Sequence, residues 1–416
     1  MKTDLLKKLG RINTVPAGWK LTTVGKVCKI RNDLRKPLST EERAKIQGAY
    51  PYYGPTGVLD FIDHHLVEGQ FALIGEDGDH FLKPEQKAQT LLVNGKFNVN
   101  NHAHLIQGTE KCSSEWFFLY FHHRDITHLI SRQGASRYKL NKDTLSKLPI
   151  LVPPLNEQLE IYKLFTTWDN AIEKTEALIA AKEKQFEWLC QTYFKPGNST
   201  NSGWEKHKIA TFVTVRNKKE VPSEETPLYS LTIENGVTAK TDRYNREFLV
   251  IDKGGKKYKV VHPKDIVFNP ANLRWGAIAR SEVEHKVVLS PIYEVLKVDE
   301  NKIDSDFLTH LLTCSRQIAI FATMVEGTLV ERMAVKIDTF LSCHIYVPSS
   351  KEEQKQIANV LNLSKQEISL LKNTLEQYRS QKRGLMQKLL TGEWQVSSVQ
   401  PIAEGARQEL SKERTA

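Results

Sequence analysis

Side chains that can recognise DNA bases gather in a few short stretches of this chain. Arginine can donate two hydrogen bonds to guanine, asparagine can pair in the same way with adenine, and lysine or serine can bind phosphates. In the N-terminal half we predict DNA contacts from Tyr52, Tyr53, Asn100, Asn101, His102, Arg132, Arg137 and Lys139. In the C-terminal half the candidates are Arg216, Lys218, Asn269, Asn272, Arg274, Trp275 and Arg332. Each residue alone is more simply explained as part of a turn or as a solvated charge, so the prediction rests on their clustering.

Motifs for catalysis are absent or incomplete. Residues 268–272 (FNPAN) approach the Asn-Pro-Pro-aromatic motif of adenine methyltransferases, but lack the second proline and the aromatic ring that would stack on a flipped base. Glu300 and Lys302 resemble the end of a nuclease motif without its upstream Pro-Asp. His102 and His104 have no Cys, Asp or Glu at the spacing of a metal site. No phosphate-binding GxxxxGK[ST] loop and no GxGxxG occurs. We therefore predict no catalytic, cofactor-binding or metal-binding residue.

The composition is that of a globular protein with a basic excess. Of the 416 residues, 40% are hydrophobic and 26% are charged, which is ordinary for such proteins. The net charge of +10 and the pI near 9.1 are a modest indication of a polyanionic partner. No apolar run approaches the ~20 residues that span a bilayer, so we expect no membrane segment. The five cysteines are scattered without a CxxC pair, which favours a reducing cytoplasm over a disulfide or zinc framework.

The sequence contains an internal duplication. The stretch GWKLTTVGKVCKIRN, which contains Trp19, is matched by GWEKHKIATFVTVRN, which contains Trp204. A second pair, ILVPPLNEQLEIYKLF with Glu157 and IYVPSSKEEQKQIANVL with Glu353, repeats at a similar distance. A period of roughly 190 residues is too long for a solenoid repeat and indicates a duplicated domain.

Each copy of the second stretch opens a long helix with a regular apolar seam. Its residues step by three and four, as in a coiled coil, for about five heptads. The seam consists of Ile161, Phe165, Trp168, Ile172, Ile179, Phe186 and Leu189 in the first helix, and of Ile357, Leu361, Ile368, Leu375, Tyr378 and Leu385 in the second. Because a whole domain joins the helices, they are free to pair antiparallel. The alternative is that both are core helices of a bundle.

The predicted fold class is α+β, with two globular domains with β-rich cores alternating with two long helices that pair as an antiparallel, pseudo-two-fold coiled coil. Short strand-like runs alternate with turn signals in both globular domains. The predicted boundaries are residues 1–150 for the first domain, 151–195 for the first helix, 196–203 for a linker, 204–346 for the second domain, 347–394 for the second helix, and 395–416 for a polar tail that we expect to be disordered.

Together these features resemble the specificity subunit of type I restriction–modification enzymes. The resemblance covers about residues 10 to 394 and rests on the twofold layout and on residues 148–158 (LPILVPPLNEQ) at the entry to the first helix. It extends to YYG at 52–54, LIGEDG at 73–78 and NNHAH at 100–104, stretches like those of many target recognition domains. The second helix entry departs from the pattern, since it reads Pro-Ser-Ser-Lys in place of Pro-Pro-Leu-Asn.

The resemblance implies a chain without enzymatic activity of its own. Two target recognition domains would each read one half of a split, asymmetric sequence in double-stranded DNA, the first domain the 5′ half and the second the 3′ half. The helices would set the gap between the halves and dock two adenine-N6 methyltransferase (modification) subunits, which bring S-adenosylmethionine. Two restriction subunits, which use ATP and Mg²⁺ for translocation and cleavage, would complete a complex in a prokaryotic cytoplasm.

Two other functions stay open from the residues alone. One is a stand-alone adenine DNA methyltransferase or nuclease, which the incomplete motifs disfavour. The other is a coiled-coil assembly scaffold with no role on DNA. The recognised bases and the gap length do not follow from residue order, because base reading depends on which side chains reach a groove and on how the DNA deforms.

Overall fold

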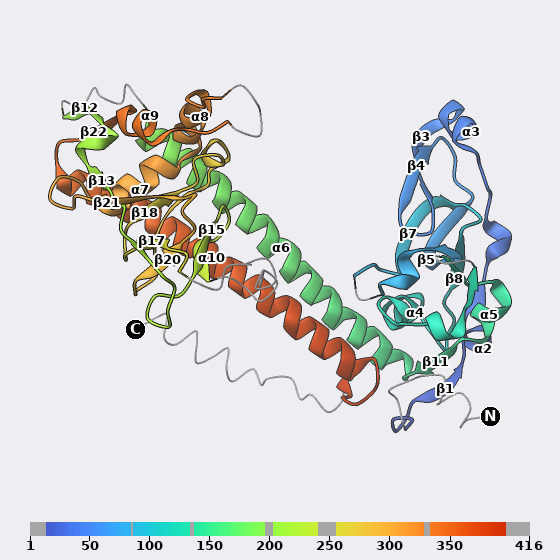
Figure 1. The fold of residues 1–416 in the computed structure, drawn as a ribbon. Coiled ribbons are helices and arrows are strands. Elements are labelled where there is room, and N and C mark those ends of the chain that lie inside the picture. The colour runs from blue at the N-terminus through green and yellow to red at the C-terminus, as the bar shows by residue number, and fades with distance from the viewer. Residues whose placement is uncertain are drawn as a thin grey trace, which may run out of the picture. The chain divides into compact units, whose positions relative to one another are not determined.

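The protein folds into two compact units in a computed structural model (Figure 1). The structure describes residues 14–84, 86–133, 137–195, 203–239, 255–327 and 333–396. One unit combines residues 1–174 with 376–416, and the other comprises residues 175–375. Each unit therefore contains one globular head and a part of each long helix. Most of the tail predicted to be disordered, from residue 397, lies outside the described residues.

The first head is built around a mixed sheet. Its elements are β1 (Lys20–Thr23), α2 (Val24–Val27), β2 (Lys29–Ile30), η1 (Asn32–Leu34), α3 (Thr40–Lys45), β3 (Gln47–Tyr53), β4 (Val58–Ile62), β5 (Val67–Gly75), β6 (Asp77–Gly78), η2 (His80–Leu82), β7 (Thr90–Val99), β8 (Ala103–Gln107), α4 (Ser114–Phe121), η3 (Thr127–Leu129), β9 (Ser131–Gln133), β10 (Arg137–Lys139), α5 (Lys142–Lys147) and β11 (Pro149–Val152). The main sheet has the strand order β2-β8-β5-β7-β3-β4, and small sheets join β1 to β11 and β6 to β10 and β9. The last five residues of β5 are all buried, so this central strand forms part of the core.

The second head repeats the central strand order. Its elements are β12 (Trp204–Lys208), η4 (Ile209–Thr211), β13 (Val213–Val215), β14 (Lys219–Glu220), β15 (Tyr229–Thr232), β16 (Gly236–Ala239), β17 (Tyr258–Val261), β18 (Ile266–Phe268), η7 (Leu273–Trp275), β19 (Ile278–Arg280), β20 (Val287–Leu289), β21 (Glu294–Val298), α7 (Ser305–Thr313), α8 (Ser315–Thr323), α9 (Ile337–Ser342) and β22 (His344–Pro348). The order β13-β21-β18-β19 corresponds to β2-β8-β5-β7 of the first head, and β12 pairs with β22 as β1 pairs with β11. The α+β class and the two β-rich heads are confirmed.

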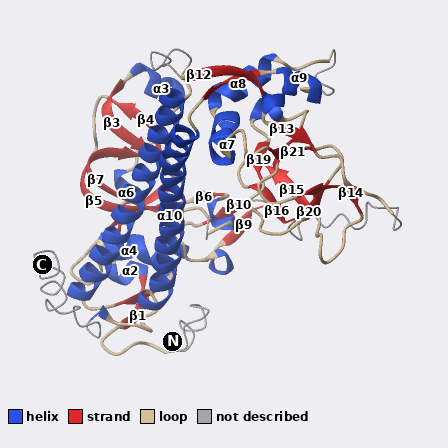
Figure 2. Ribbon diagram, turned by 90° about the vertical axis from the view of Figure 1, so that its left-hand side faces the viewer, coloured by secondary structure: helices blue, strands red, loops and turns tan. Residues whose placement is uncertain are grey.

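The two long helices, α6 (Leu155–Tyr193) and α10 (Lys351–Leu389), pair antiparallel within each unit (Figures 1 and 2). In the first unit the Trp168 ring meets the Tyr378 ring edge-on, with 5.7 Å between centroids. In the second unit Lys182 forms an ion pair with Glu367 at 2.8 Å. A residue farther along α6 is thus paired with a residue nearer the start of α10. The two helices therefore run antiparallel. Every residue of the predicted seam is buried or half-buried. No described helix is both long and apolar enough to span a bilayer.

A tryptophan and a glutamate connect each head to the helix that follows it. In the first unit the Trp19 indole donates a hydrogen bond to the Glu157 carboxylate at 3.1 Å. In the second unit the Trp204 indole donates to Glu353 at 3.0 Å. The tryptophan and the glutamate of the internal repeat therefore make the same contact in both units, although 138 and 149 residues separate the partners. We call each of these contacts, with its neighbouring glutamine, a head–helix joint.

The neighbouring glutamine completes each joint from the side of the head. Gln158 accepts a hydrogen bond from the backbone N–H of Ser113 at 2.9 Å, and Gln354 accepts one from Asp304 at 2.8 Å. Ser113 and Asp304 are the N-cap residues of α4 and α7. Both glutamines are almost fully buried. Because a buried amide is costly without partners, the joint fixes the first turn of the long helix to a helix of the head.

We predict that Trp19→Phe lowers the free energy of unfolding of the first unit by about 2 kcal/mol, because a hydrogen bond to a charged group is lost. Burial increases this cost, because the Glu157 carboxylate would lose its donor while shielded from water. Glu157 is only 9% exposed, and its other carboxylate oxygen has no hydrogen-bond partner among the described residues. Chemical denaturation of the purified chain measures the change. Trp188→Phe is the matched control, because Trp188 is 60% exposed, and should change stability by less than about 0.5 kcal/mol. Equal effects of the two variants would contradict a stabilising joint.

A buried histidine links the second head to α10 and makes this unit sensitive to acid. His310 of α7 is 3% exposed and donates a hydrogen bond from Nε2 to the Asn362 side chain at 2.7 Å. Burial lowers the pKa of His310 from 6.5 to about 4. Between these values the unfolded chain binds a proton that the folded chain does not bind. Stability is therefore lost as the pH falls from 6.5 towards 4.

We predict that this histidine contributes about 3 kcal/mol to the loss of stability on acidification, at about 1.4 kcal/mol for each unit of pKa difference. Denaturant titrations at a series of pH values between neutral and mildly acidic measure the slope of the free energy of unfolding against pH. His310→Gln should flatten the slope, and His285→Gln, at an exposed position, should leave it unchanged. A slope that is the same in all three proteins would rule out His310 as the source.

Candidate nucleic-acid interface

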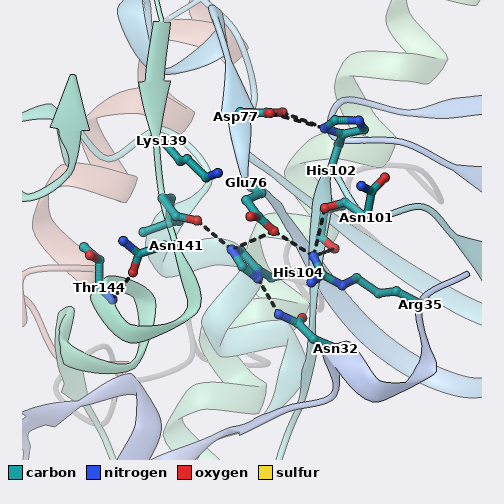
Figure 3. A network of polar contacts seen from close by, with 12 residues as sticks. Asn32, Arg35, Glu76, Asp77, Asn101, His102, His104, Lys139, Asn141 and Thr144 are labelled. Carbon is teal, nitrogen blue, oxygen red and sulfur yellow. Dashed lines mark hydrogen bonds and ion pairs between the residues drawn. The ribbon is translucent and has the colours of Figure 1, made fainter. Parts of the chain in front are cut away.

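Three segments that are distant in sequence meet at one edge of the first head (Figure 3). They are the loop after β5, the turn between β7 and β8, and the hairpin of β9 and β10. β10 pairs with β6, so that Lys139 lies opposite Asp77. The backbone N–H of Glu76 donates to His102 at 2.8 Å, and that of Leu140 donates to Glu76 at 2.7 Å. The structure thus brings together two clusters that the sequence placed apart, Asn100–His102 and Arg132–Lys139.

A layer of buried and half-buried polar groups lies beneath this edge. His104 has no exposed surface, and its Nε2 lies 2.7 Å from the carbonyl of Leu140. Since a carbonyl can only accept, Nε2 carries the proton and Nδ1 accepts from the Asn32 amide at 2.8 Å. Burial lowers the pKa of His104, which keeps the ring neutral. Beside it Arg35 donates to the Glu76 carboxylate at 2.7 Å.

Several predicted residues of the first head are exposed at or near this edge. Asn101, His102 and Arg132 are exposed and Lys139 is half-buried. The His102 ring forms a hydrogen bond with Asp77 at 3.1 Å. Arg137 lies in β10. These positions are consistent with contact to an external partner, and their contact with DNA stays a prediction.

Two predicted residues of the first head have structural roles instead. Tyr52 has no exposed surface, and its hydroxyl donates to the carbonyl of Lys36 at 2.8 Å and accepts from the N–H of Leu38 at 2.9 Å. A buried side chain cannot touch DNA, so the prediction for Tyr52 is wrong. Residues 47–53 form β3, in which the Tyr52 side chain points into the core. Asn100 is 7% exposed and its side chain accepts from the N–H of His102, which stabilises the turn. Tyr53 is half-buried, edge-on to Phe97.

In the second head the corresponding loop follows β18. Arg274 lies over the Trp275 ring, with 4.1 Å between its guanidinium carbon and the ring centroid. Its guanidinium also contacts the Met333 sulfur at 3.7 Å. Trp275 is 59% exposed, so the stacked pair presents an aromatic face to solvent. The N–H of Val335 donates to the carbonyl of Pro270 at 3.0 Å, as Leu140 does to Glu76 in the first head.

The other candidates of the second head have different environments. Asn272 is exposed, whereas the Asn269 side chain accepts from the N–H of Ala271 at 3.0 Å and stabilises the loop. Lys218 is exposed and forms an ion pair with Glu220 at 2.9 Å. The Lys286 and Lys218 ammonium groups lower the pKa of Glu220 to about 2. Arg332 lies outside the described residues.

Arg216 forms an internal ion pair. It makes two hydrogen bonds, at 2.7 and 3.1 Å, to Asp265, which is 3% exposed. Removing the partner of a buried carboxylate is strongly destabilising, so this guanidinium stabilises the fold, and its contact with DNA stays a prediction. Its counterpart in the repeat, Arg31, likewise bonds within the head, to Asp33 and Gln107.

Sequence reasoning missed the buried layer of the first head. Asn32 and Glu76 lie in stretches that the sequence singled out, but their contacts with His104 and Arg35 were not predicted, because these partners lie 41 to 72 residues away. No group of three or more histidine, cysteine, aspartate or glutamate side chains among the described residues is placed to hold a metal ion.

Comparisons with known proteins find similarity to specificity subunits of type I restriction enzymes. Residues 16–182 match the family described as "Type I restriction modification DNA specificity domain". A putative type I restriction enzyme specificity subunit of Haemophilus influenzae is 36% identical over 146 residues, and this match spans only 36% of that relative. The specificity subunit of the type I restriction enzyme MjaVIII of Methanocaldococcus jannaschii is 21% identical over 410 residues, which cover 92% of this chain and 95% of the relative.

A solved structure supports the fold over the same length. The S subunit of a type I restriction–modification system from M. genitalium matches with a TM-score of 0.59 and 14% identity, and the match covers 92% of this chain and 98% of that chain. At this identity the likeness concerns the fold alone. Over nearly its whole length, this chain is thus similar to specificity subunits of type I restriction–modification systems.

Proposed function

We propose that this chain gives a type I restriction–modification complex its DNA sequence specificity, with each head reading one half of a bipartite target. The observation that carries the proposal is the duplicated head–helix joint. It fixes one head to the start of α6 and the other to the start of α10, through the same tryptophan–glutamate contact. Two heads held by equivalent joints on antiparallel helices are suited to reading two separated sites with a fixed spacing.

The target is asymmetric, because the two heads present different chemistry at the same place in the fold. The loop after β5 and its neighbours offer Asp77, Asn101 and His102, which can exchange hydrogen bonds with base edges. The loop after β18 offers the stacked Arg274 and Trp275. The antiparallel pairing would place the heads on opposite strand orientations, with the first head on the 5′ half and the second on the 3′ half.

The chain itself is non-catalytic and works through partners in a prokaryotic cytoplasm. Two modification subunits dock on the helices and supply adenine-N6 methylation with S-adenosylmethionine, and two restriction subunits add ATP- and Mg²⁺-dependent cleavage. Exposed apolar side chains on the helices support docking, since large exposed apolar residues are unfavourable in water unless covered. They include Leu155, Leu159, Leu178, Trp188, Val360, Leu363 and Leu370.

The decisive experiment is expression of this chain with a cognate modification subunit in a methylation-deficient host, followed by mapping of N6-methyladenine across the genome. We expect a split motif with two different halves and a constant gap. Methylation by this chain alone would show that it is a stand-alone methyltransferase. A stable complex that neither methylates nor binds duplex DNA at any salt concentration would instead support a scaffold without a role on DNA.

We predict that Arg274→Ala relaxes base preference in the second half-site only. Loss of a good arginine contact costs about 1–3 kcal/mol of discrimination, roughly fivefold to 150-fold. Methylation of duplexes with single base changes in each half measures this effect. Arg124→Ala is the matched control, because Arg124 also stacks on an aromatic ring, Tyr120, at 3.9 Å, but away from the candidate edge. A changed preference in the first half would show that the heads are assigned to the wrong half-sites.

We predict that removing one heptad from both helices shortens the gap and leaves both half-sites unchanged. Residues 175–181 of α6 and 369–375 of α10 are suitable, because the nearby ion pair of Glu183 and Lys372 shows that these segments face each other. Deleting seven residues preserves the seam. The motif map of the paired deletion gives the gap directly. The single deletion of 175–181 breaks the pairing and serves as the control, with reduced methylation. An unaltered gap in an active paired deletion would refute the role of the helices in spacing.

A further inference from the structure

His104 connects segments that converge at the edge of the first head. It lies on β8 and pairs across the sheet with Ile74, two residues before Glu76. Its Nε2–H holds the carbonyl of Leu140, where the β9–β10 hairpin ends, and its Nδ1 holds the Asn32 side chain. A single buried ring therefore contacts both the hairpin and the first turn after β2.

Arg35 and Glu76 extend this connection to the remaining segment. The Arg35 guanidinium donates to the Glu76 carboxylate at 2.7 Å, to the carbonyl of Asn101 at 3.0 Å and to that of Ala103 at 3.3 Å. The Glu76 carboxylate lies 3.8 Å from the His104 ring. The loop after β5 and the turn before β8 are thus tied to each other beside the histidine (Figure 3).

The edge consequently has two layers with different tasks. The lower layer consists of Asn32, Arg35, Glu76 and His104, and the upper layer consists of Asp77, Asn101, His102 and Lys139. In the lower layer Arg35 and Glu76 are about one-fifth exposed and His104 is not exposed at all. His104 therefore cannot touch a base, yet each upper residue is adjacent in sequence to a backbone group or side chain that the lower layer holds.

The second head has a different residue at the position of His104. Strand register places His104 opposite Ile74 on β5 and Glu294 opposite Phe268 on β18, the corresponding strand. The Glu294 carboxylate forms an ion pair with Lys259 of β17 at 2.6 Å, and Lys259 is 6% exposed. At this position the two heads thus use different buried contacts beneath loops that also differ.

From these contacts we propose that His104 is a positioning residue that sets the base preference of the first half-site, by holding the end of β10 and the neighbouring loops in one arrangement. The inference rests on the proposed function and goes beyond it, because it assigns half-site specificity to a side chain that does not reach the DNA. Base reading needs donors and acceptors placed within a fraction of an ångström, so a loosened support changes which bases are accepted.

The test uses the complex of the full chain with its modification subunit, and duplexes that carry the mapped target or one base change in either half. His104→Leu should lower discrimination against wrong bases in the first half by about tenfold, equivalent to one lost base contact. Discrimination in the second half should stay within about twofold. His104→Gln, which keeps an N–H donor towards Leu140, should recover most of the loss.

His310→Leu provides the matched control, since it removes a buried histidine from the other head outside the candidate edge. It should lower stability without changing either half-site preference. If His104→Leu does not fold, Asn32→Ala removes one of the two contacts of the ring and should weaken first-half discrimination in the same direction.

Equal loss of methylation on right and wrong targets in the His104 variants would overturn the proposal and leave only a role in stability. So would unchanged discrimination in the first half. If the wild-type complex recognises no split target, the proposed function itself fails, and this outcome is seen before any variant is compared.

Discussion

The hydrogen bond between a tryptophan of each head and a glutamate of the following helix is the contact on which the arrangement within each unit depends. β11 ends at Val152 and α6 begins at Leu155, so few residues separate a strand from a helix of 39 residues. The two connecting residues, Pro153 and Pro154, restrict the backbone between head and helix, and side-chain contacts add to this restriction. Trp19 and Gln158 hold the start of the helix from two sides, and the Trp19 ring also packs edge-on against Trp116 with 5.5 Å between centroids. An acidic residue in the first turn of the helix also complements the helix dipole.

The duplication conserves this joint and the central strand order, and it lets the rest of each head differ. The Trp204 ring packs against Phe307 of α7 as Trp19 packs against Trp116 of α4. Farther from the joint the chemistry changes, because a neutral histidine in one head corresponds to a glutamate–lysine pair in the other. The geometry of a joint is constrained, because its donors and acceptors are buried and each must be paired with the other. Loops at the open edge have no such requirement, so they can vary more freely.

Much of the fold could be predicted from the sequence, because it depends on local period and on repetition. The apolar seam of α6 and α10 follows from residues that step by three and four, and the two heads follow from matching stretches. The candidate edge could be predicted only in part. Tyr52 is buried because residues 47–53 form a strand, and the choice between strand and loop depends on pairing with β4 and β7. Arg216 forms its ion pair with Asp265, 49 residues away, and no local sequence pattern predicts a partner at that distance.

The rigidity of the joints determines how two modest recognition surfaces can give one specific complex. When two binding modules are linked, the second contact becomes intramolecular, and its effective concentration depends on whether the link can reach the second site. A flexible link would allow binding to half-sites with many different gaps, and also to targets that match only in part. Under the proposed function, a link built from paired helices, with a buried glutamine and a tryptophan–glutamate bond at each head, would favour a single gap. Under the proposed function, specificity for the spacing therefore comes from side chains in the joints, and specificity for the bases comes from the loops that the buried layers support.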